Sequence, residues 1–305
     1  MQPVITILGP TASGKTKLAV QIAKQINAEI ISADSRQIYK YMDIGTGKDL
    51  NEYNDGNNII PYHLIDILEP DINYSVYDFQ KDCIKSINII SKNNKIPIIC
   101  GGTGLYLESF LLNYKIHNAK PDTQLREQLE TKSQIDLINI FKSLGNQYNP
   151  KYHNTKRRII RGIEIISQNK NNNLDMKNTI ANTKFFHLIL GINIDRSKLL
   201  NHIKARLKFR LENGLIQEVE NLIAKKNVSI TRLKYFGLEY KFVAMYLNKE
   251  ITYNDLCNNL NVAINQFSKK QMTFFRRMEK RGLNIHWVNP ESNDVYALVT
   301  SFLAP

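Results

Sequence analysis

The sequence is poor in cysteine and contains no long apolar run. Its three cysteines, Cys83, Cys100 and Cys257, lie far apart and none belongs to a CxxC pair, which argues against a disulfide framework and against a zinc module. No segment approaches the roughly eighteen apolar residues that a membrane-spanning helix needs, and the first residues lack the pattern of a signal peptide. These absences predict a cytoplasmic protein without a membrane partner, and nothing in the sequence requires more than a monomer.

The remaining composition is that of an ordinary globular protein, with 43% hydrophobic and 23% charged residues, and it argues against a largely disordered or fibrous chain. Residues 1–100 contain 10 Lys and Arg against 11 Asp and Glu, a net charge of −1. Residues 101–305 contain 31 against 17, a net charge of +14. This asymmetry indicates a polyanionic partner, although lysines spread over solvated helix faces would explain the charge alone equally well.

The first part of the chain has the pattern of a parallel α/β sheet. Residues 4–8 form a β-branched apolar run that predicts a buried strand, and apolar residues at every fourth position from Leu18 to Ile26 predict the following helix. Further strands are predicted over 29–32 and 95–100. We expect a parallel sheet flanked by helices, with ligands at the carboxyl ends of the strands.

The middle and the end of the chain have a different character. Residues 118–183 hold polar helical segments and an Asn-rich stretch, 169–173, that predicts a surface loop. The apolar segment 185–191 predicts a return to the sheet. We expect a catalytic core over 1–117 and 184–305 and a helical insertion domain over 118–183. The C-terminal part is expected to be largely helical, with an apolar stripe formed by Leu256, Leu260, Ala263, Phe267 and Phe274.

One motif indicates a chemical function directly. Between the first predicted strand and helix lies a GxxxxGK[ST] sequence, a P-loop, formed by Gly9, Pro10, Thr11, Ala12, Ser13, Gly14, Lys15 and Thr16. Main-chain N–H groups of such a loop converge on phosphate oxygens, the lysine adds a positive charge and the threonine hydroxyl can bind Mg²⁺. The motif predicts a P-loop NTPase-like fold, with Lys15 and Thr16 catalytic and Thr16 the metal ligand. It does not separate kinases, nucleotide hydrolases and pyrophosphate-binding transferases.

Further motifs make the sequence resemble a specific family. The segment 32–39 reads SADSRQIY, and it is followed by MDIGTGK over 42–48, GGTGLY over 101–106, NTKRRIIRGIE over 154–164 and KKQMTFFR over 269–276. In these blocks and their order the chain resembles the bacterial tRNA dimethylallyltransferases. The resemblance implies transfer of a dimethylallyl group from dimethylallyl diphosphate to the N6 amine of the adenine 3′-adjacent to the anticodon of a tRNA.

The resemblance assigns the two halves of this reaction to particular residues. The P-loop and Arg206, which matches an arginine of the family, would hold the diphosphate and neutralise the charge that builds on it as it leaves. Asp34, at the end of the second predicted strand, would take the proton of the attacking amine. From spacing alone, a solvated helix arginine and a metal-binding aspartate of the P-loop kinase type remain alternatives for these two residues.

The resemblance also implies a set of tRNA contacts. Residues next to Asp34 would bind the extruded adenine and its neighbours, and basic residues would contact phosphates, although each alone could be a solvated surface cation. The predicted contacts are Asp34, Ser35, Arg36, Gln37, Thr103, Arg126, Arg157, Arg158, Ile159, Ile160, Arg161, Lys269, Lys270 and Gln271. Three positions in these motifs depart from the family pattern, namely Thr155, Lys270 and Phe274.

Three other functions remain open on the sequence. A related prenyltransferase that acts on free adenosine phosphates would use the same loop but would need neither the basic second part nor the insertion. A small-molecule P-loop kinase would transfer the γ-phosphate of ATP. A tRNA-binding protein without activity would explain the charge, but not the intact Lys15, Thr16 and Asp34.

Overall fold

The chain folds into two compact units. Unit 1 comprises Met1–Tyr114 and Asn182–Pro305, and unit 2 comprises Lys115–Ala181. The sequence placed the insertion at 118–183, a few residues later at each end. The structure is a computed structural model, and it describes residues 2–54, 59–116, 118–119, 121–145, 148–150, 153–172, 185–292 and 294–304.

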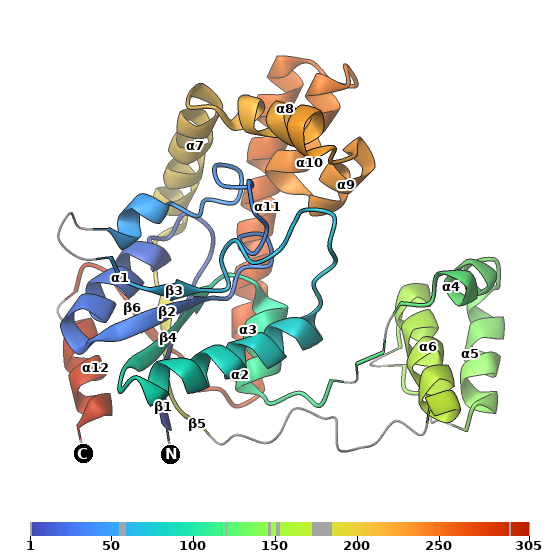
Figure 1. The fold of residues 1–305 in the computed structure, drawn as a ribbon, viewed down its shortest axis with the longest axis horizontal. Coiled ribbons are helices and arrows are strands. Elements are labelled where there is room, and N and C mark those ends of the chain that lie inside the picture. The colour runs from blue at the N-terminus through green and yellow to red at the C-terminus, as the bar shows by residue number, and fades with distance from the viewer. Residues whose placement is uncertain are drawn as a thin grey trace. The chain divides into compact units, whose positions relative to one another are not determined.

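Unit 1 is built on a six-stranded sheet in the order β3-β2-β4-β1-β5-β6 (Figure 1). Every neighbouring pair is parallel, which confirms the predicted fold class. The strands are β1 (Gln2–Leu8), β2 (Ala28–Ser32), β3 (Tyr62–His63), β4 (Ile96–Gly101), β5 (Phe185–Ile192) and β6 (His286–Val288). The short β3 and β6 were not predicted. Because β1 lies between β4 and β5, its carboxyl end is flanked by the ends of two other strands.

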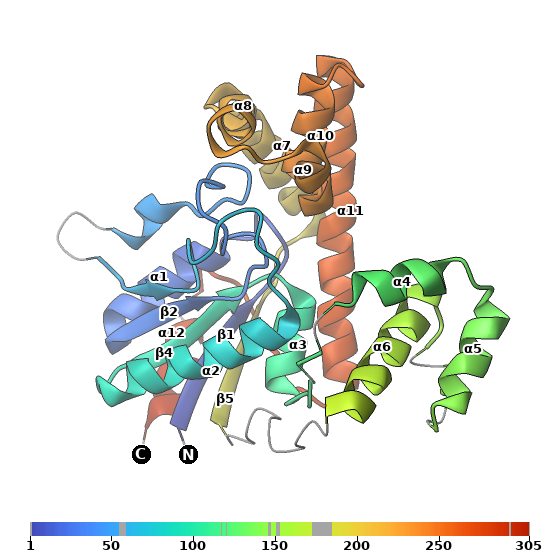
Figure 2. The ribbon, with the colours of Figure 1, turned by 45° about the vertical axis from the view of Figure 1, so that its right-hand side comes forward.

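Helices cover both faces of this sheet (Figure 2). One face carries α1 (Lys15–Ile26), α12 (Asp294–Leu303) and the 3-10 helix η1 (Leu50–Tyr53). The other face carries α2 (Val76–Lys92), α3 (Gly104–Leu111) and the C-terminal half of α11 (Tyr253–Lys280). In β1, Ile5 and Ile7 pack on the first face, whereas Val4 and Leu8 pack on the second, as the alternation of side chains along a strand requires.

The other helices of unit 1 form a bundle beyond the carboxyl end of β1 (Figure 2). They are α7 (Arg196–Glu212), α8 (Leu215–Lys226), α9 (Ile230–Phe236), α10 (Leu238–Leu247) and the first half of α11. The apolar stripe predicted for α11 is correct only at its start, Leu256 and Leu260. From there the buried face continues through Ile264, Ser268, Gln271, Phe275 and Met278, and not through Ala263 and Phe267. Phe274 is partly buried and packs against the core of the second sheet face.

Unit 2 is a small helical unit made of α4 (Thr123–Glu130), α5 (Gln134–Ser143) and α6 (Lys156–Asn172). Its core contains Leu129, Leu137, Phe141, Ile159, Ile160 and Ile163. The prediction of a loop over 169–173 is wrong for residues 169–172, because α6 continues to Asn172. Asn173 lies outside the described residues. In the described part of either unit, no helix has the length and apolar character needed to cross a bilayer.

Candidate active site

The P-loop lies where β1 ends and α1 begins. Gly14 has a φ of +85°, in the left-handed region that favours glycine, and it directly precedes Lys15, the first residue of α1. A Cβ on Gly9 would lie 2.9 Å from the Cβ of Ile192 and 2.9 Å from the Oγ of Ser13, so a larger residue would clash. Both motif glycines are therefore required by geometry, one by its backbone conformation and the other by close packing.

The loop presents hydrogen-bond donors that lack acceptors. The Oγ of Ser13 is buried and has no hydrogen-bond partner among the described residues. Thr16 belongs to the first turn of α1, where free N–H groups give the helix end a partial positive charge. A phosphate on this loop would accept hydrogen bonds from both sources, which fits the predicted function of residues 9–16.

Two cations lie beside the loop. The Nζ of Lys15 donates to the carbonyl oxygen of Pro10 at 2.6 Å, and burial, with repulsion from Arg206, lowers the pKa of Lys15 to about 8. Arg206 on α7 donates from its Nη2 to the Oγ1 of Thr11. Burial, with repulsion from Arg210, lowers the pKa of Arg206 to about 10. Because both cations are desolvated and repelled by a like charge, the site favours an added anion.

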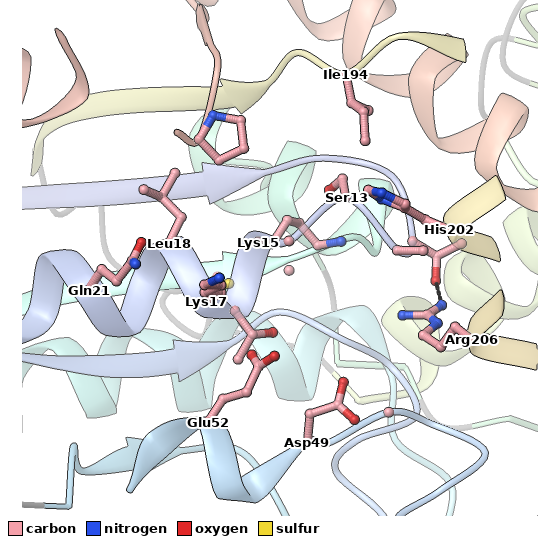
Figure 3. Close-up of a pocket in the computed structure, with 18 of the residues that line it drawn as sticks. Ser13, Lys15, Lys17, Leu18, Gln21, Asp49, Glu52, Ile194, His202 and Arg206 are labelled. Carbon is pink, nitrogen blue, oxygen red and sulfur yellow. Dashed lines mark hydrogen bonds between the residues drawn. The ribbon is translucent and has the colours of Figure 1, made fainter. Parts of the chain in front are cut away.

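The P-loop opens into a pocket of about 960 Å³, here called the P-loop pocket (Figure 3). Residues 11–16 and Arg206 line it, and Asp49 and Glu52 face it from another wall. Burial raises the pKa of Glu52, and the neighbouring Asp49 raises it further. The pocket thus joins a cationic phosphate cradle to an acidic wall.

The residues of the P-loop pocket fit a magnesium ion that is bound together with phosphate. Within the described ranges of the chain, no group of three or more His, Cys, Asp or Glu side chains is arranged to hold a metal by itself. Mg²⁺ commonly takes only one or two protein ligands and completes its shell with phosphate oxygens and water. Thr16 lines the pocket, and its hydroxyl is an oxygen ligand that could bind a Mg²⁺ ion shared with the phosphate.

A smaller cavity of about 250 Å³, here called the side pocket, shares part of its wall with the P-loop pocket. Its lining is mainly aromatic and aliphatic where α9, α10 and α11 contribute, and polar at Ser35 and Thr103. The residues that line both cavities are Thr11, Asp34, Thr46 and Arg206. Asp34 is the one carboxylate in this set, so the two cavities meet at a single candidate base.

The backbone around Asp34 is fixed by hydrogen bonds to the end of β4. Ala33 donates to the carbonyl oxygen of Cys100 at 2.8 Å and accepts from the N–H of Thr103 at 3.2 Å. The N–H of Ser35 donates to the Oγ1 of Thr103 at 2.9 Å. The Oδ1 of Asp34 accepts from the N–H of Arg36 at 2.8 Å, whereas its Oδ2 has no partner among the described residues. One carboxylate oxygen therefore orients the side chain and the other remains free to accept a proton.

Two glutamines that were predicted to contact tRNA are already engaged inside the protein. Gln271 is buried, and its amide accepts from the N–H of Thr11 at 2.8 Å and donates to the carbonyl oxygen of Gly102 at 2.9 Å. Gln37 accepts from the Oγ of Ser32 at 2.8 Å and donates to the carbonyl oxygen of Gly47 at 2.9 Å. Both amides therefore have a structural role in holding neighbouring backbone and side chains, and the RNA contacts of Gln271 and Gln37 stay predictions.

The predicted RNA contacts of unit 2 separate into three groups. The side chains of Ile159 and Ile160 are buried in the core of the unit, so the backbone is the part of these two residues that is left for the predicted RNA contact, which stays a prediction. Arg126 and Arg161 both pair with the carboxylate of Glu164, which is buried. The exposed cations of unit 2 are Arg157 and Arg158, and in unit 1 the predicted contacts Lys269 and Lys270 on α11 are exposed as well.

The structure adds residues that the sequence did not single out. Glu218 of α8 accepts hydrogen bonds from the N–H groups of Asp43, Ile44 and Gly45 at 2.8, 2.6 and 3.0 Å. These bonds fix the segment 43–45, and the next residues, Thr46 and Gly47, line the P-loop pocket. The motif 42–48 contained this segment, but its attachment to a helix some 170 residues later is a tertiary feature that no local pattern reveals.

A buried ion pair also lies in the wall of the side pocket. The Nη1 of Arg210 lies 3.4 Å from the Oε1 of Glu239, and the Nη2 of Arg210 is buried without a partner among the described residues. Burial raises the pKa of Glu239, which the charge of Arg210 opposes. A helix-period pattern gave no signal for this pair, since both residues are polar members of otherwise apolar helix faces.

The chain is similar to known prenyl-transfer proteins over nearly its whole length. Residues 37–278 match the model of the family described as IPP transferase, and residues 2–62 match the model described as isopentenyl transferase. A tRNA dimethylallyltransferase 1 of Azobacteroides pseudotrichonymphae is 46% identical over 97% of this chain and 94% of that protein. The corresponding values are 45%, 94% and 92% for a tRNA dimethylallyltransferase 1 of Parabacteroides distasonis.

A solved structure agrees with these sequence matches. The tRNA isopentenylpyrophosphate transferase from Bacillus halodurans superposes with a TM-score of 0.69 at 29% identity. The match covers 99% of this chain and 95% of that one. The sheet, the helices around it and the inserted unit therefore occur together in a protein of this kind.

Proposed function

The chain belongs to the IPP transferase family, and from this we propose that it transfers a dimethylallyl group to the N6 amine of the adenine 3′-adjacent to the anticodon of a tRNA, releasing diphosphate. It is a prenyl-group transferase that acts on tRNA, as are the relatives that it matches over almost its full length. The exact base is proposed from the resemblance to the tRNA dimethylallyltransferases, and the roles of individual residues are proposed from chemistry and geometry.

The donor half of the reaction fits the P-loop pocket. As the bond between the allylic carbon and the diphosphate oxygen breaks, the electron pair leaves with the diphosphate, whose growing charge must be neutralised. The phosphate-binding part of the P-loop pocket is surrounded by groups that can neutralise this charge. They are the N–H groups at the start of α1, Lys15 and the Arg206–Thr11 pair. A Mg²⁺ ion held by Thr16 and by the diphosphate would supply further positive charge there.

The acceptor half fits Asp34. The adenine N6 lone pair is conjugated with the ring, so attack on the allylic carbon is easier when a base takes the N6 proton as the new carbon–nitrogen bond forms. The free Oδ2 of Asp34 can receive this proton, while the bond from Arg36 to Oδ1 keeps the carboxylate in place. The single observation that carries the proposal is that this carboxylate lines both cavities.

We assign tRNA phosphate contacts to the exposed cations Arg157, Arg158, Lys269 and Lys270. Their exposure and the net charge of +14 over residues 101–305 support this assignment. We further propose that the protein works in the cytoplasm, where its acceptor RNA occurs, and that it acts as a monomer.

The test is transfer of a labelled dimethylallyl group from its diphosphate to an unmodified tRNA, followed by mapping of the labelled base. We expect label on the adenine 3′ to the anticodon, and loss of transfer when Mg²⁺ is chelated. Absence of label with intact tRNA would refute the proposal. Equal transfer to AMP would favour the acceptor class of free adenosine phosphates, and release of the γ-phosphate of ATP would favour a kinase.

A further inference from the structure

A large exposed aromatic side chain lies beside the side pocket and has no part in the chemistry described so far. Tyr235, near the end of α9, is 60% exposed. The next residue, Phe236, is buried and lines the side pocket. The two rings meet edge to face with centroids 6.2 Å apart, so the exposed ring is placed relative to the cavity by a buried neighbour.

Arg232 holds this exposed ring from one side. Its three donor nitrogens bind the carbonyl oxygen of Pro70 at 2.7 Å, the Oδ1 of Asn73 at 2.7 Å and the carbonyl oxygen of Ile72 at 2.6 Å. Its guanidinium carbon lies 5.0 Å from the ring centre of Tyr235 and 4.8 Å from that of Phe236. Because the guanidinium is fixed by three hydrogen bonds, the tyrosine packs against a rigid surface.

Arg36 approaches the same ring from the side pocket. Its Nε donates to the carbonyl oxygen of Phe236 at 2.9 Å, and its guanidinium carbon lies 5.8 Å from the ring centre of Tyr235. Arg36 lines the side pocket, and no carboxylate within the described residues pairs with it. The rim of the cavity therefore combines an exposed π-face with an arginine whose charge is not neutralised.

We propose that the Tyr235 ring stacks on a nucleobase directly adjacent to the extruded adenine, and that Arg36 faces a phosphate of the same nucleotide. This inference rests on the proposed function. An adenine can enter a protein cavity only by leaving its neighbours in the anticodon loop, and those neighbours lose stacking energy that an aromatic side chain can restore. An exposed tyrosine ring that packs on a fixed guanidinium, next to an arginine without a carboxylate partner among the described residues, matches the π-face and the charge of one nucleotide.

Tyr235→Ala, Tyr235→Phe and Tyr253→Ala separate stacking from other roles. Tyr253 is a matched control, because it is an exposed tyrosine in the same unit and lies eleven residues before the pocket residue Ile264 on α11, about 16 Å along the helix. The probe is an unmodified anticodon stem-loop RNA in which 2-aminopurine replaces the base on one side or the other of the target adenine. Binding and transfer are measured for each variant, together with the affinity for dimethylallyl diphosphate alone.

We expect Tyr235→Ala to weaken RNA binding about tenfold and to abolish the stacking-dependent quenching of one 2-aminopurine. Tyr235→Phe and Tyr253→Ala should resemble the unchanged protein, and the affinity for dimethylallyl diphosphate should stay the same in all variants. Unchanged RNA binding in Tyr235→Ala would overturn the inference while leaving the proposed function intact. A defect as large in Tyr235→Phe would assign the role to the hydroxyl and not to the ring. If the unchanged protein itself fails to modify tRNA, the proposed function fails first.

Discussion

Only one of the two carboxylate oxygens of Asp34 has a hydrogen-bond partner among the described residues, and the proposed role of Asp34 as a base depends on this. One oxygen accepts from the N–H of Arg36 at 2.8 Å, which sets the orientation of the side chain. The other has no partner among the described residues although it lies between two cavities. A carboxylate held on one side and free on the other can accept a proton without losing its position.

Asp34→Asn should reduce kcat roughly 100-fold or more. Asparagine keeps the shape and the hydrogen bond from Arg36 but cannot accept the N6 proton as a carboxylate does. Asp71→Asn, a change at an exposed surface position, is the control. Single-turnover transfer and RNA affinity should be measured together. Preserved turnover with a large loss of affinity would make Asp34 a binding residue.

Lys15 predicts a pH dependence. Its pKa in the free protein is lowered to about 8 by burial, with a contribution from Arg206, and a bound diphosphate would raise it again. The charged form of Lys15 attracts the anion. The affinity for dimethylallyl diphosphate is therefore highest below the pKa of the free protein, and it falls as the pH rises above about 8, by up to roughly tenfold per pH unit. Titration of the protein with dimethylallyl diphosphate at several pH values measures this.

Lys15→Ala provides the comparison for the pH series. The affinity of this variant for dimethylallyl diphosphate should be low at every pH and should lack the decline above pH 8, because the titrating amine is absent. Titration of the ligand itself affects both proteins alike, so it cancels in the comparison. The same pH profile in both proteins would show that Lys15 does not titrate in this range.

At the level of elements, α11 connects loops that the sequence shows only as separate motifs. Gln271 joins the P-loop to the segment after β4 through Thr11 and Gly102. In the same way, Glu218 of α8 holds the segment 43–45. The site therefore depends on polar side chains of distant helices, each of which takes the place of water as the hydrogen-bond partner of a loop backbone.

Gln271→Ala should lower the melting temperature of the protein by several degrees and weaken diphosphate binding. The change leaves the buried carbonyl oxygen of Gly102 without its partner, a cost of about 1–3 kcal/mol. It also removes the acceptor of the half-buried N–H of Thr11. Thr273→Ala is the control on the same helix, since Thr273 is exposed and bonds only to the carbonyl oxygen of Lys269. Equal melting temperatures for both variants would contradict the structural role of Gln271.

The sequence predicts those elements whose signal is local. The P-loop is set by glycine geometry, and the long strands are set by apolar runs, so both are recognised from neighbouring residues. The register of α11 was misassigned after Leu260 because the buried face contains the polar Ser268 and Gln271, while Phe267 faces the side pocket. Apolar periodicity cannot distinguish a residue that lines a cavity from one that fills a core.

At the scale of the whole molecule, the cavities and the excess of positive charge serve different parts of the proposed function. The two cavities that we assign to the donor and to the reacting base belong to unit 1, and the net charge of +14 lies in residues 101–305. Within unit 2, Glu164 engages two of the predicted RNA-binding arginines. The sequence identified the basic cluster, but only the fold separates its exposed members from those that pair internally.

Arg157→Gln combined with Arg158→Gln should reduce the salt dependence of tRNA binding. Each cation that neutralises a phosphate contributes about 0.7–0.9 to the slope of log affinity against log salt, so two should contribute roughly 1.5. A double change at the exposed Lys81 and Lys85 of α2 removes the same charge elsewhere and should alter the slope less. Equal slopes for the two double variants would remove this part of unit 2 from RNA binding.

In the proposed reaction, a diphosphate on the P-loop and an extruded adenine approach Asp34 from the two cavities that share this residue. A crystal structure with an unmodified anticodon stem-loop RNA and an unreactive thio-analogue of dimethylallyl diphosphate tests it most directly. We expect phosphate oxygens on the N–H groups of residues 12–16, because the N–H of Thr11 already donates to Gln271, and the adenine N6 about 3 Å from the Asp34 carboxylate. An adenine bound elsewhere, or an Asp34 side chain turned away from N6 by more than the width of one water, would contradict it.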